Sequence, residues 1–308
     1  MKRSLYNTFI TGFFFFIGCD DVINPELPKA EAVLVVDAWI NNLPGPQVIK
    51  LTRSQPYFDS SQPPAVSGAV VNVSTADKNF PFVETDNGQY VWNPEPGETF
   101  GVIGETYTLI ISVDGEEYTS TSQMKRVPAI DSVTFRFEEE NFILPDSYWG
   151  EFWSRDSEGE GDTYWIKSYK NEMLLNKPEE INIAYDAGFS KGGGLDNLIF
   201  IPPIRDTINP FEQDENDEFL SPFEDGDSLY VEVHSINEAA FNFLFNVQIQ
   251  TNRPGGFGEL FAQPLANVPT NIENTNATST QPAQGIFNVA AVSFNGKRLD
   301  VSEVPKGN

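Results

Sequence analysis

Short segments in which apolar and polar residues alternate follow one another through the first half of the chain. Alternation with a period of two is typical of strands that bury one face. The turn dipeptides Asn87-Gly88 and Asp114-Gly115 fall between such segments, where they favour tight hairpins. Turn signals recur about every 10 residues, so the pattern predicts an Ig-like or Greek-key β-sandwich over residues 31–127. Its strands are expected at residues 34–40, 48–53, 70–74, 82–84, 89–92, 106–112 and 117–123.

The second half adds long polar loops and one segment of helical spacing. Ala240, Phe243, Leu244 and Val247 share one stripe of a helix near residues 236–250. Strands are expected at residues 133–137, 148–153, 163–169, 228–234 and 285–294, and polar loops at residues 176–197 and 206–218. At about 150 residues per domain, the length of 308 indicates two domains. We therefore expect a mainly β fold, in which a β-rich second domain with one helix covers residues 128–308.

The first 18 residues have the organisation of a secretory signal peptide. Two basic residues precede an apolar run of residues 9–17, which is too short to span a membrane. The segment Phe16-Ile17-Gly18-Cys19 resembles the lipobox of bacterial lipoproteins. The resemblance implies cleavage before Cys19 and lipidation of its thiol and its new amino group. Residues 19–30 would then form a lipidated tether, whereas an ordinary secretory signal is the alternative.

Asp20 and Asp21 directly follow the cysteine. Acidic residues at this place resemble the surface-export signal of Bacteroidota lipoproteins, although in other Gram-negative bacteria an Asp there can mean retention in the inner membrane. Several acyl chains would hold the protein in a membrane almost permanently. We expect the outer face of the outer membrane.

Composition changes the range of functions that remain. The chain has 45 acidic against 19 basic residues, and a net charge of −26 opposes binding to nucleic-acid phosphates. One Cys cannot form an internal disulfide, and one His leaves no multi-histidine metal site. We therefore expect a binding protein with no required cofactor, rather than an enzyme.

Four acidic residues alternate with small residues between positions 156 and 162: Asp156, Glu158, Glu160 and Asp162. Calcium prefers six to eight oxygen ligands, several of which a Gly-containing acidic loop can supply. The spacing differs from that of an EF-hand, and a solvated hairpin loop is the alternative. The acidic segments 214–218 and 224–227 allow the same two interpretations. The loop of residues 156–162 is thus a candidate calcium site.

Aromatic side chains are concentrated in the expected strands 148–153 and 163–169. Such rings stack on the apolar faces of sugars and peptides and anchor interfaces. Alternation places Trp165 and Tyr169 on one face and Tyr164 on the other, so at least half of the rings belong to the core. The candidate ligand-binding residues are Trp149, Trp153, Trp165 and Tyr169, with burial in the core as the alternative.

Three other candidate motifs lack residues that a catalytic or phosphate-binding site would need, or cannot be recognised from sequence. His234 lies beside Glu232 on one expected strand, with no nucleophile motif nearby, which favours a structural or surface histidine. Gly192-Gly193-Gly194 lacks the Lys-Ser/Thr that completes a phosphate-binding loop. Carboxylate pairs for glycoside hydrolysis are distant in sequence, so 45 acidic residues hide any such pair.

Seven short segments are spread over nearly the whole mature chain: residues 34–40, 66–71, 104–109, 127–132, 226–229, 267–272 and 285–287. Together they resemble a family of Bacteroidota outer-membrane lipoproteins of unknown function, whose genes tend to lie beside TonB-dependent receptors. The resemblance implies an accessory binding subunit that captures a small nutrient, glycan or peptide for a TonB-dependent β-barrel receptor. A stand-alone adhesion or structural lipoprotein is the alternative, followed by a carboxylate-based hydrolase. The resemblance assigns no catalytic or binding residues.

Overall fold

The computed structural model describes residues 31–56, 59–208, 212–213, 216 and 219–306. The expected signal peptide, Cys19 and the tether of residues 19–30 lie outside the described residues. From residue 32 onward the chain forms one compact unit built mainly of strands. This confirms the predicted mainly β fold.

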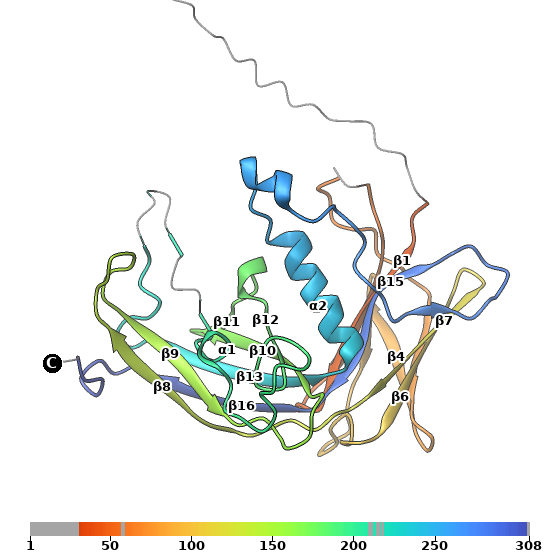
Figure 1. Cartoon of the computed structure of the whole chain (residues 1–308). Coiled ribbons are helices and arrows are strands. Elements are labelled where there is room, and N and C mark those ends of the chain that lie inside the picture. Colours follow the sequence, from red (N-terminus) through yellow and green to blue (C-terminus); the bar gives the residue numbers. More distant parts are fainter. Residues whose placement is uncertain (1–30, 57–58, 209–211, 214–215, 217–218, 307–308) are drawn as a thin grey trace, which may run out of the picture. The chain divides into compact units, whose positions relative to one another are not determined.

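Nine strands form one sheet around the first hydrophobic core (Figure 1). On β6, Tyr107, Leu109 and Ile111 are fully buried while the residues between them are partly exposed, as the alternation predicts. Neighbouring strands are antiparallel except for β1 and β15, which run parallel. In spatial order the strands are β14 (Glu273–Asn274), β7 (Glu116–Gln123), β6 (Thr106–Val113), β3 (Val70–Ser74), β4 (Asn79–Asp86), β5 (Gln89–Trp92), β2 (Gln47–Arg53), β1 (Leu34–Asn41) and β15 (Ala283–Ala290).

Strand β4 joins the two halves of this sheet. Its residues 79–82 pair with β3, whereas its residues 83–86 pair with β5, with a register shift between Glu84 and Asp86. The sequence predicts a sandwich of two sheets here. Because β4 passes from one half to the other, the strands instead form one continuous sheet that folds back over its own core.

The two ends of the nine-stranded sheet meet through side chains. The Asn271 amide donates from Nδ2 to the carbonyl oxygen of Phe287 at 2.8 Å and accepts the Phe287 N–H at 2.9 Å. The Ser122 hydroxyl accepts the N–H of Val289 at 3.0 Å. These bonds satisfy backbone groups that a further strand would otherwise pair, and they leave the sheet nearly closed.

A second sheet contains β11 (Met173–Leu174), β10 (Thr163–Lys170), β13 (Ser228–Ile236) and β16 (Val292–Arg298) in that order, and β12 (Asn182–Tyr185) also pairs with β10. Strands β8 (Ile130–Glu138) and β9 (Ser147–Ser154) form a separate hairpin. The hairpin and the second sheet share a core that includes Phe152, Tyr164 and Val231. The short helix α1 (Pro202–Arg205) adds Ile204 to this core.

The long helix α2 (Glu238–Thr251) occupies the segment in which helical spacing predicts it. It begins after Asn237, whose side-chain oxygen accepts the N–H of Ala240 at 2.8 Å and so caps the first turn. Its buried residues include Phe241 and Leu244, which pack with Ile183, Tyr185 and Ile286. Two 3-10 turns, η1 (Pro178–Glu180) and η2 (Gly256–Phe261), flank the helix in the sequence.

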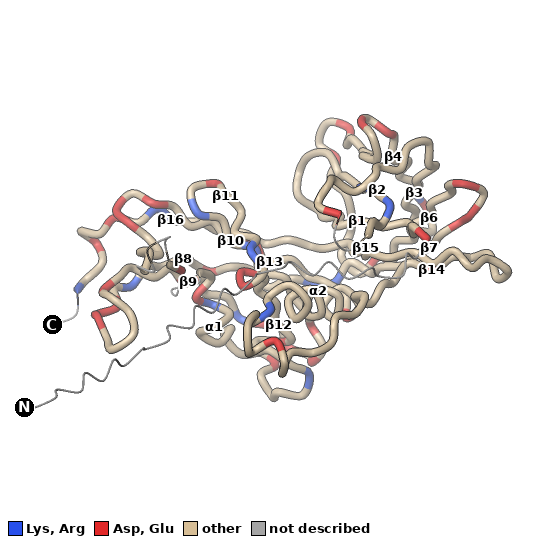
Figure 2. The backbone as a smooth tube through the Cα atoms, turned by 90° about the horizontal axis from the view of Figure 1, so that it is seen from above, with Lys and Arg blue, Asp and Glu red and all other residues tan. Residues whose placement is uncertain are grey.

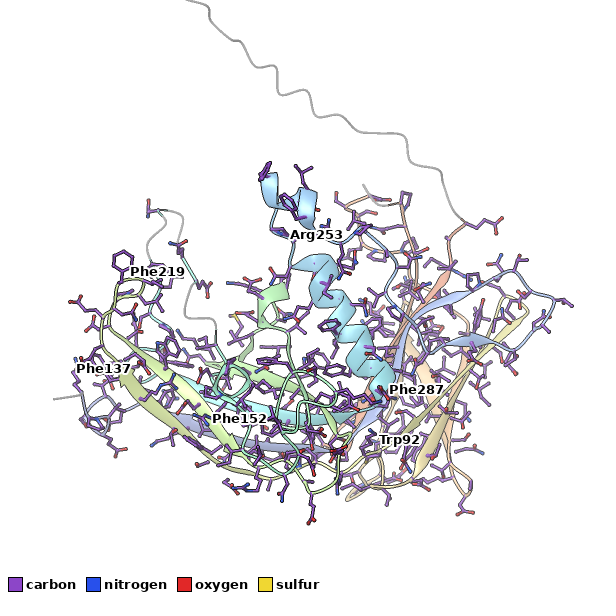
Figure 3. All side chains as sticks on the ribbon, viewed as in Figure 1. Trp92, Phe137, Phe152, Phe219, Arg253 and Phe287 are labelled. Carbon is purple, nitrogen blue, oxygen red and sulfur yellow. The ribbon has the colours of Figure 1, made fainter. Side chains whose placement is uncertain are left out.

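The segment 283–298 belongs to both sheets. The sequence predicts one strand at residues 285–294, but β15 ends at Ala290 and β16 begins at Val292, with Ala291 bonded to Ser235 between them. The expected domain boundary after residue 127 falls between β7 and β8, yet β14 and β15 come from the C-terminal half. Trp92 and Phe287, 195 positions apart (287 − 92), therefore lie in the same core (Figure 3).

Candidate functional site

A groove of about 460 Å³ opens among β9, η1, β12 and α2. Its apolar lining consists of Trp149, Ile181, Ile183, Phe189, Pro203, Ile208 and Phe245. Its polar lining consists of Glu179, Glu180, Asn182, Asp206, Thr207 and Gln248. Largely apolar walls with a few convergent polar groups are typical of small-molecule sites. The groove is therefore the first candidate site.

Charged side chains fix the groove wall at β9. The Arg136 guanidinium contacts the Glu151 carboxylate at 2.5 Å and the Asp206 carboxylate at 3.2 Å. The Arg205 guanidinium contacts Glu151 at 3.3 Å from the other side. Burial raises the pKa of the Asp206 carboxyl even though Arg136 opposes that rise. Glu151 is itself buried, so the network holds its members in one arrangement.

Two of the predicted aromatic residues belong to this region. Trp149 lines the groove, and the Arg136 guanidinium lies 4.9 Å from its ring centre. Trp153 lies four residues further along β9, with the Arg205 guanidinium 4.1 Å from its ring centre. Cation–π contacts of this kind orient both the rings and the charges.

Thr207 is the unusual residue of the groove. Its φ angle is +51°, a left-handed conformation that is rare for a β-branched residue. Among the described residues, its buried hydroxyl oxygen has no hydrogen-bond partner. Backbone strain of this kind concentrates at functional sites, which agrees with its place in the groove lining.

The other two predicted aromatic residues lie elsewhere. Trp165 packs against Trp39 at 4.8 Å between ring centres, beside the core under α2. Tyr169 donates its hydroxyl hydrogen to Glu232 at 3.2 Å on the same face of the second sheet. The structure therefore places Trp149 in the groove lining and Trp153 beside the groove on the same strand, and it places Trp165 and Tyr169 in a separate cluster on the second sheet.

His234 is buried in that polar cluster. Its Nε2 lies 2.8 Å from the Glu232 carboxylate. Burial lowers the pKa of His234 to about 4, and nearby Lys167 also acts against the charged imidazole. Burial alone would raise the pKa of Glu232, but the bond to His234 brings that pKa below its ordinary value. The pair is thus a neutral imidazole bonded to a carboxylate, which agrees with the structural role predicted for His234.

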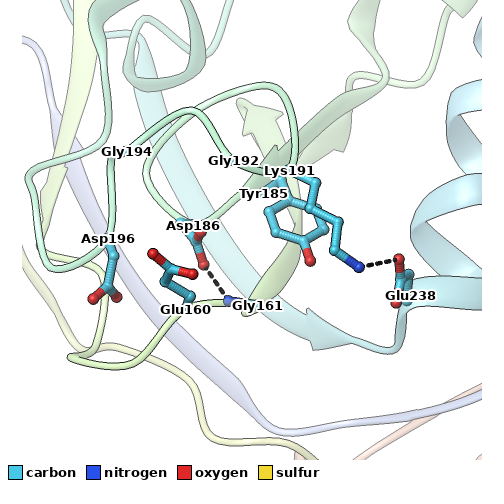
Figure 4. Close-up of a pocket in the computed structure, with 9 residues that line it drawn as sticks. All are labelled: Glu160, Gly161, Tyr185, Asp186, Lys191, Gly192, Gly194, Asp196 and Glu238. Atoms are coloured by element: carbon cyan, nitrogen blue, oxygen red, sulfur yellow. Dashed lines mark hydrogen bonds and ion pairs between the residues drawn. The ribbon is translucent and has the colours of Figure 1, made fainter.

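A second cavity, of about 330 Å³, is lined by acidic residues (Figure 4). The carboxylates of Asp156, Asp186 and Asp196 lie within 4.8 Å of one another at its edge. Each also accepts a local donor: Tyr164 bonds to Asp156 at 2.6 Å, Gly161 to Asp186 at 2.8 Å and Gly159 to Asp196 at 2.9 Å. The carboxylates therefore already stabilise the loops that carry them.

The four predicted calcium ligands take different places. Asp156 belongs to the group of three carboxylates, and Glu160 lines the cavity. Asp162 instead forms an ion pair with Arg126 at 2.7 Å, and Glu158 is exposed outside the group. Asp186 and Asp196 were not predicted, because they lie 30 and 40 residues after Asp156 (186 − 156 and 196 − 156) and no spacing rule joins them. If an ion binds here, these three carboxylates and Glu160 would hold it.

Acidic residues are spread along the loops of the described chain (Figure 2). The arginines beside the groove are engaged with carboxylates, as Arg136 and Arg205 show. The negative charge is thus dispersed, whereas the lining of the groove is mainly apolar.

The molecule is thus a β-rich protein with a groove lined by aromatic residues. Beside the groove, Arg136 and Arg205 form ion pairs with Glu151. Residues 20–294 match the family described as a domain of unknown function (DUF4249), and the chain belongs to that family. A comparison with curated proteins found no match. None of the helices formed by the described residues is long and apolar enough to cross a membrane.

Proposed function

We propose that this protein is a lipid-anchored lipoprotein on the outer face of the outer membrane, where it acts as the binding subunit of a TonB-dependent nutrient receptor. The observation that carries the binding role is the groove, with its aromatic walls. The family match begins at residue 20, directly after Cys19, which supports a mature chain that starts at the cysteine. The Bacteroidota origin and the receptor partner rest on the family resemblance of the sequence.

The groove is suited to binding because its wall is fixed before a ligand arrives. Arg136 and Arg205 are both held by Glu151, and each carries a tryptophan ring on its guanidinium face. A site whose side chains are already ordered loses little conformational entropy when it binds. Such a site favours capture and release of a ligand.

The groove also indicates the size and chemistry of the ligand. A volume of about 460 Å³ suits a small oligosaccharide or a short peptide. Trp149, Phe189 and Phe245 offer ring faces, while Asn182 and Gln248 offer polar groups. A ligand with both an apolar face and hydroxyl or amide groups would use all of these contacts.

Three measurements test the proposal. Full-length protein purified in mild detergent should bring down a β-barrel receptor, and Cys19→Ala should move the protein from the membrane to the soluble fraction. Native mass spectrometry of protein from its own host should detect a small molecule that is lost in Trp149→Ala with Phe245→Ala. Phe142→Ala is the control, because Phe142 is fully exposed outside the groove lining. A protein that carries neither receptor nor small molecule would contradict the binding role.

A carboxylate-based hydrolase is the second candidate. It is favoured by Asp206, a groove carboxyl whose raised pKa suits a general acid and which lies close to Glu151. Asp206→Asn should leave ligand capture intact if the groove only binds. A turnover activity that disappears in Asp206→Asn, with ligand binding retained, would establish the hydrolase instead.

A further inference from the structure

The turn η2 exposes large apolar side chains. Phe257 is 78%, Leu260 74% and Phe261 79% exposed, and Leu265 follows as a further exposed residue. The two phenylalanine rings contact each other at 5.6 Å between centres. We call these four residues the η2 patch. Clusters of large exposed apolar residues mark surfaces that contact an apolar partner.

The two charges of the same segment are paired with each other, while the buried Oε2 of Glu259 has no hydrogen-bond partner among the described residues. The Glu259 carboxylate forms an ion pair with the Arg253 guanidinium, and Arg253 also donates to the carbonyl oxygen of Gln263 at 2.9 Å. The segment is therefore electrically neutral on a chain of net charge −26. Such a segment can approach a lipid surface without the repulsion that the acidic loops would meet.

The position of the η2 patch is the second observation. It follows the C-terminal end of α2, where Figure 3 labels Arg253. Figure 1 shows that this end of α2 and the start of β1 lie on the same side of the unit that begins at residue 32. The chain thus enters this unit on the side that carries the patch.

The length of the chain before β1 limits how far that side can be from a lipid anchor. Cys19 is 15 positions before Leu34, where β1 begins (34 − 19), so even an extended chain spans at most about 54 Å. An anchor at Cys19 would hold the start of β1, and with it the patch side, within this distance of the membrane.

We propose that the η2 patch inserts its aromatic side chains into the bilayer interface and orients the protein on the membrane. This inference rests on the proposed lipid anchor. Short segments with exposed Phe and Leu lie at the boundary between headgroups and acyl chains. A bilayer is favoured over a protein partner because of the size of the η2 patch. A stable protein interface uses roughly 20 to 30 residues of each partner, whereas the patch has four.

The test uses the full-length lipidated chain in vesicles of phosphatidylethanolamine and phosphatidylglycerol. Phe261→Cys is labelled with an environment-sensitive fluorophore, which Cys19 does not take up once its thiol is acylated. Phe142→Cys is the matched control, because Phe142 is fully exposed and lies outside η2. We expect several-fold stronger quenching by lipid-borne nitroxides at position 261 than at position 142, with a blue-shifted emission.

The outcomes separate the two proposals. If the protein does not float with vesicles, the lipid anchor is refuted. If it floats but the label at position 261 stays as solvent-exposed as the label at position 142, the membrane insertion of the η2 patch is refuted and the anchor stands. A label at position 261 that responds only when the co-purified receptor is added would assign the patch to a protein interface and also refute insertion.

Discussion

Protonation of His234 should make the folded state sensitive to acid in a defined pH range. The chain has one histidine, so no other side chain with an ordinary pKa near 6.5 contributes there. Burial lowers the pKa of His234 to about 4 in the folded state. In the unfolded chain His234 therefore becomes protonated below about pH 6.5. In the folded protein it stays neutral until the pH falls to about 4. Stability is fully present above pH 6.5 and is lost as the pH falls through this range.

The magnitude follows from the two pKa values. The gap between 6.5 and about 4 corresponds to about 3 kcal/mol when the pH has fallen below both values. Between pH 7.5 and pH 5, the expected loss of unfolding free energy is about 2 kcal/mol. A loss of this size is a large part of the roughly 5–15 kcal/mol by which proteins are stable. His234 is buried, so solvent screening does little to reduce it.

Urea unfolding of the Cys19→Ala protein at a series of pH values measures this dependence. The protein must carry no polyhistidine tag, because a tag would titrate in the same range. His234→Gln is the control, since its amide can still donate to Glu232 but does not titrate. We expect the wild type to lose about 2 kcal/mol more than His234→Gln between pH 7.5 and pH 5. Equal slopes for the two proteins would refute the argument.

Three further predictions address packing and the acidic cavity. Gly285→Ala should lower the melting temperature by several degrees, because Gly285 has a φ of +101° and an added Cβ would overlap the carbonyl of Val36. Gly45→Ala is the control: Gly45 has a φ of +114° but open space around it, so the melting temperature should fall much less. Phe152→Ala should cost about 3–5 kcal/mol in urea unfolding, because Phe152 is fully buried against Phe200; a cost below 1 kcal/mol (roughly) would mean that the site collapses around the smaller residue. Calcium should raise the melting temperature no more than sodium chloride of equal ionic strength, because Asp156 and Asp186 already accept hydrogen bonds from nearby groups of the chain. A saturable, calcium-specific rise that Asp186→Asn abolishes would show a metal site.

Local pattern was sufficient to locate most strands and the long helix. Strand β6 runs from residue 106 to 113, against an expectation of 106–112, because each buried residue alternates with a more exposed one. Helix α2 begins at Glu238 after the capping residue Asn237, within the range predicted from its apolar stripe. Both signals act over a few residues and are therefore visible in sequence.

The pairing of strands was not predictable in the same way. β15 is buried along almost its whole length, so its residues show no alternation that would indicate which sheet it joins. The loop predicted at residues 176–197 contains η1 and β12, which are too short to have a periodicity of their own. These two elements provide Glu179, Asn182 and Ile183 of the groove.

Of the groove residues, only those with a local sequence signal were predicted. Aromatic enrichment pointed to Trp149 and Trp153, which the structure places at or beside the groove. Their charged partners Arg136 and Arg205 were missed, because sequence alone does not distinguish them from the other charged residues of the chain. Thr207 was missed because its importance lies in its backbone angle, which a sequence does not display.

The parallel pairing of β1 with β15 has a consequence for how the newly made chain folds. Leu34 pairs with Ala283, 249 positions later (283 − 34), so one edge of β1 has no partner until almost the entire polypeptide is present. Contacts this distant in sequence form slowly, and an unpaired strand edge readily pairs with other chains. We infer that the newly made polypeptide depends on chaperones to shield β1. A chain that is cut short before residue 283 should aggregate rather than accumulate as a folded fragment.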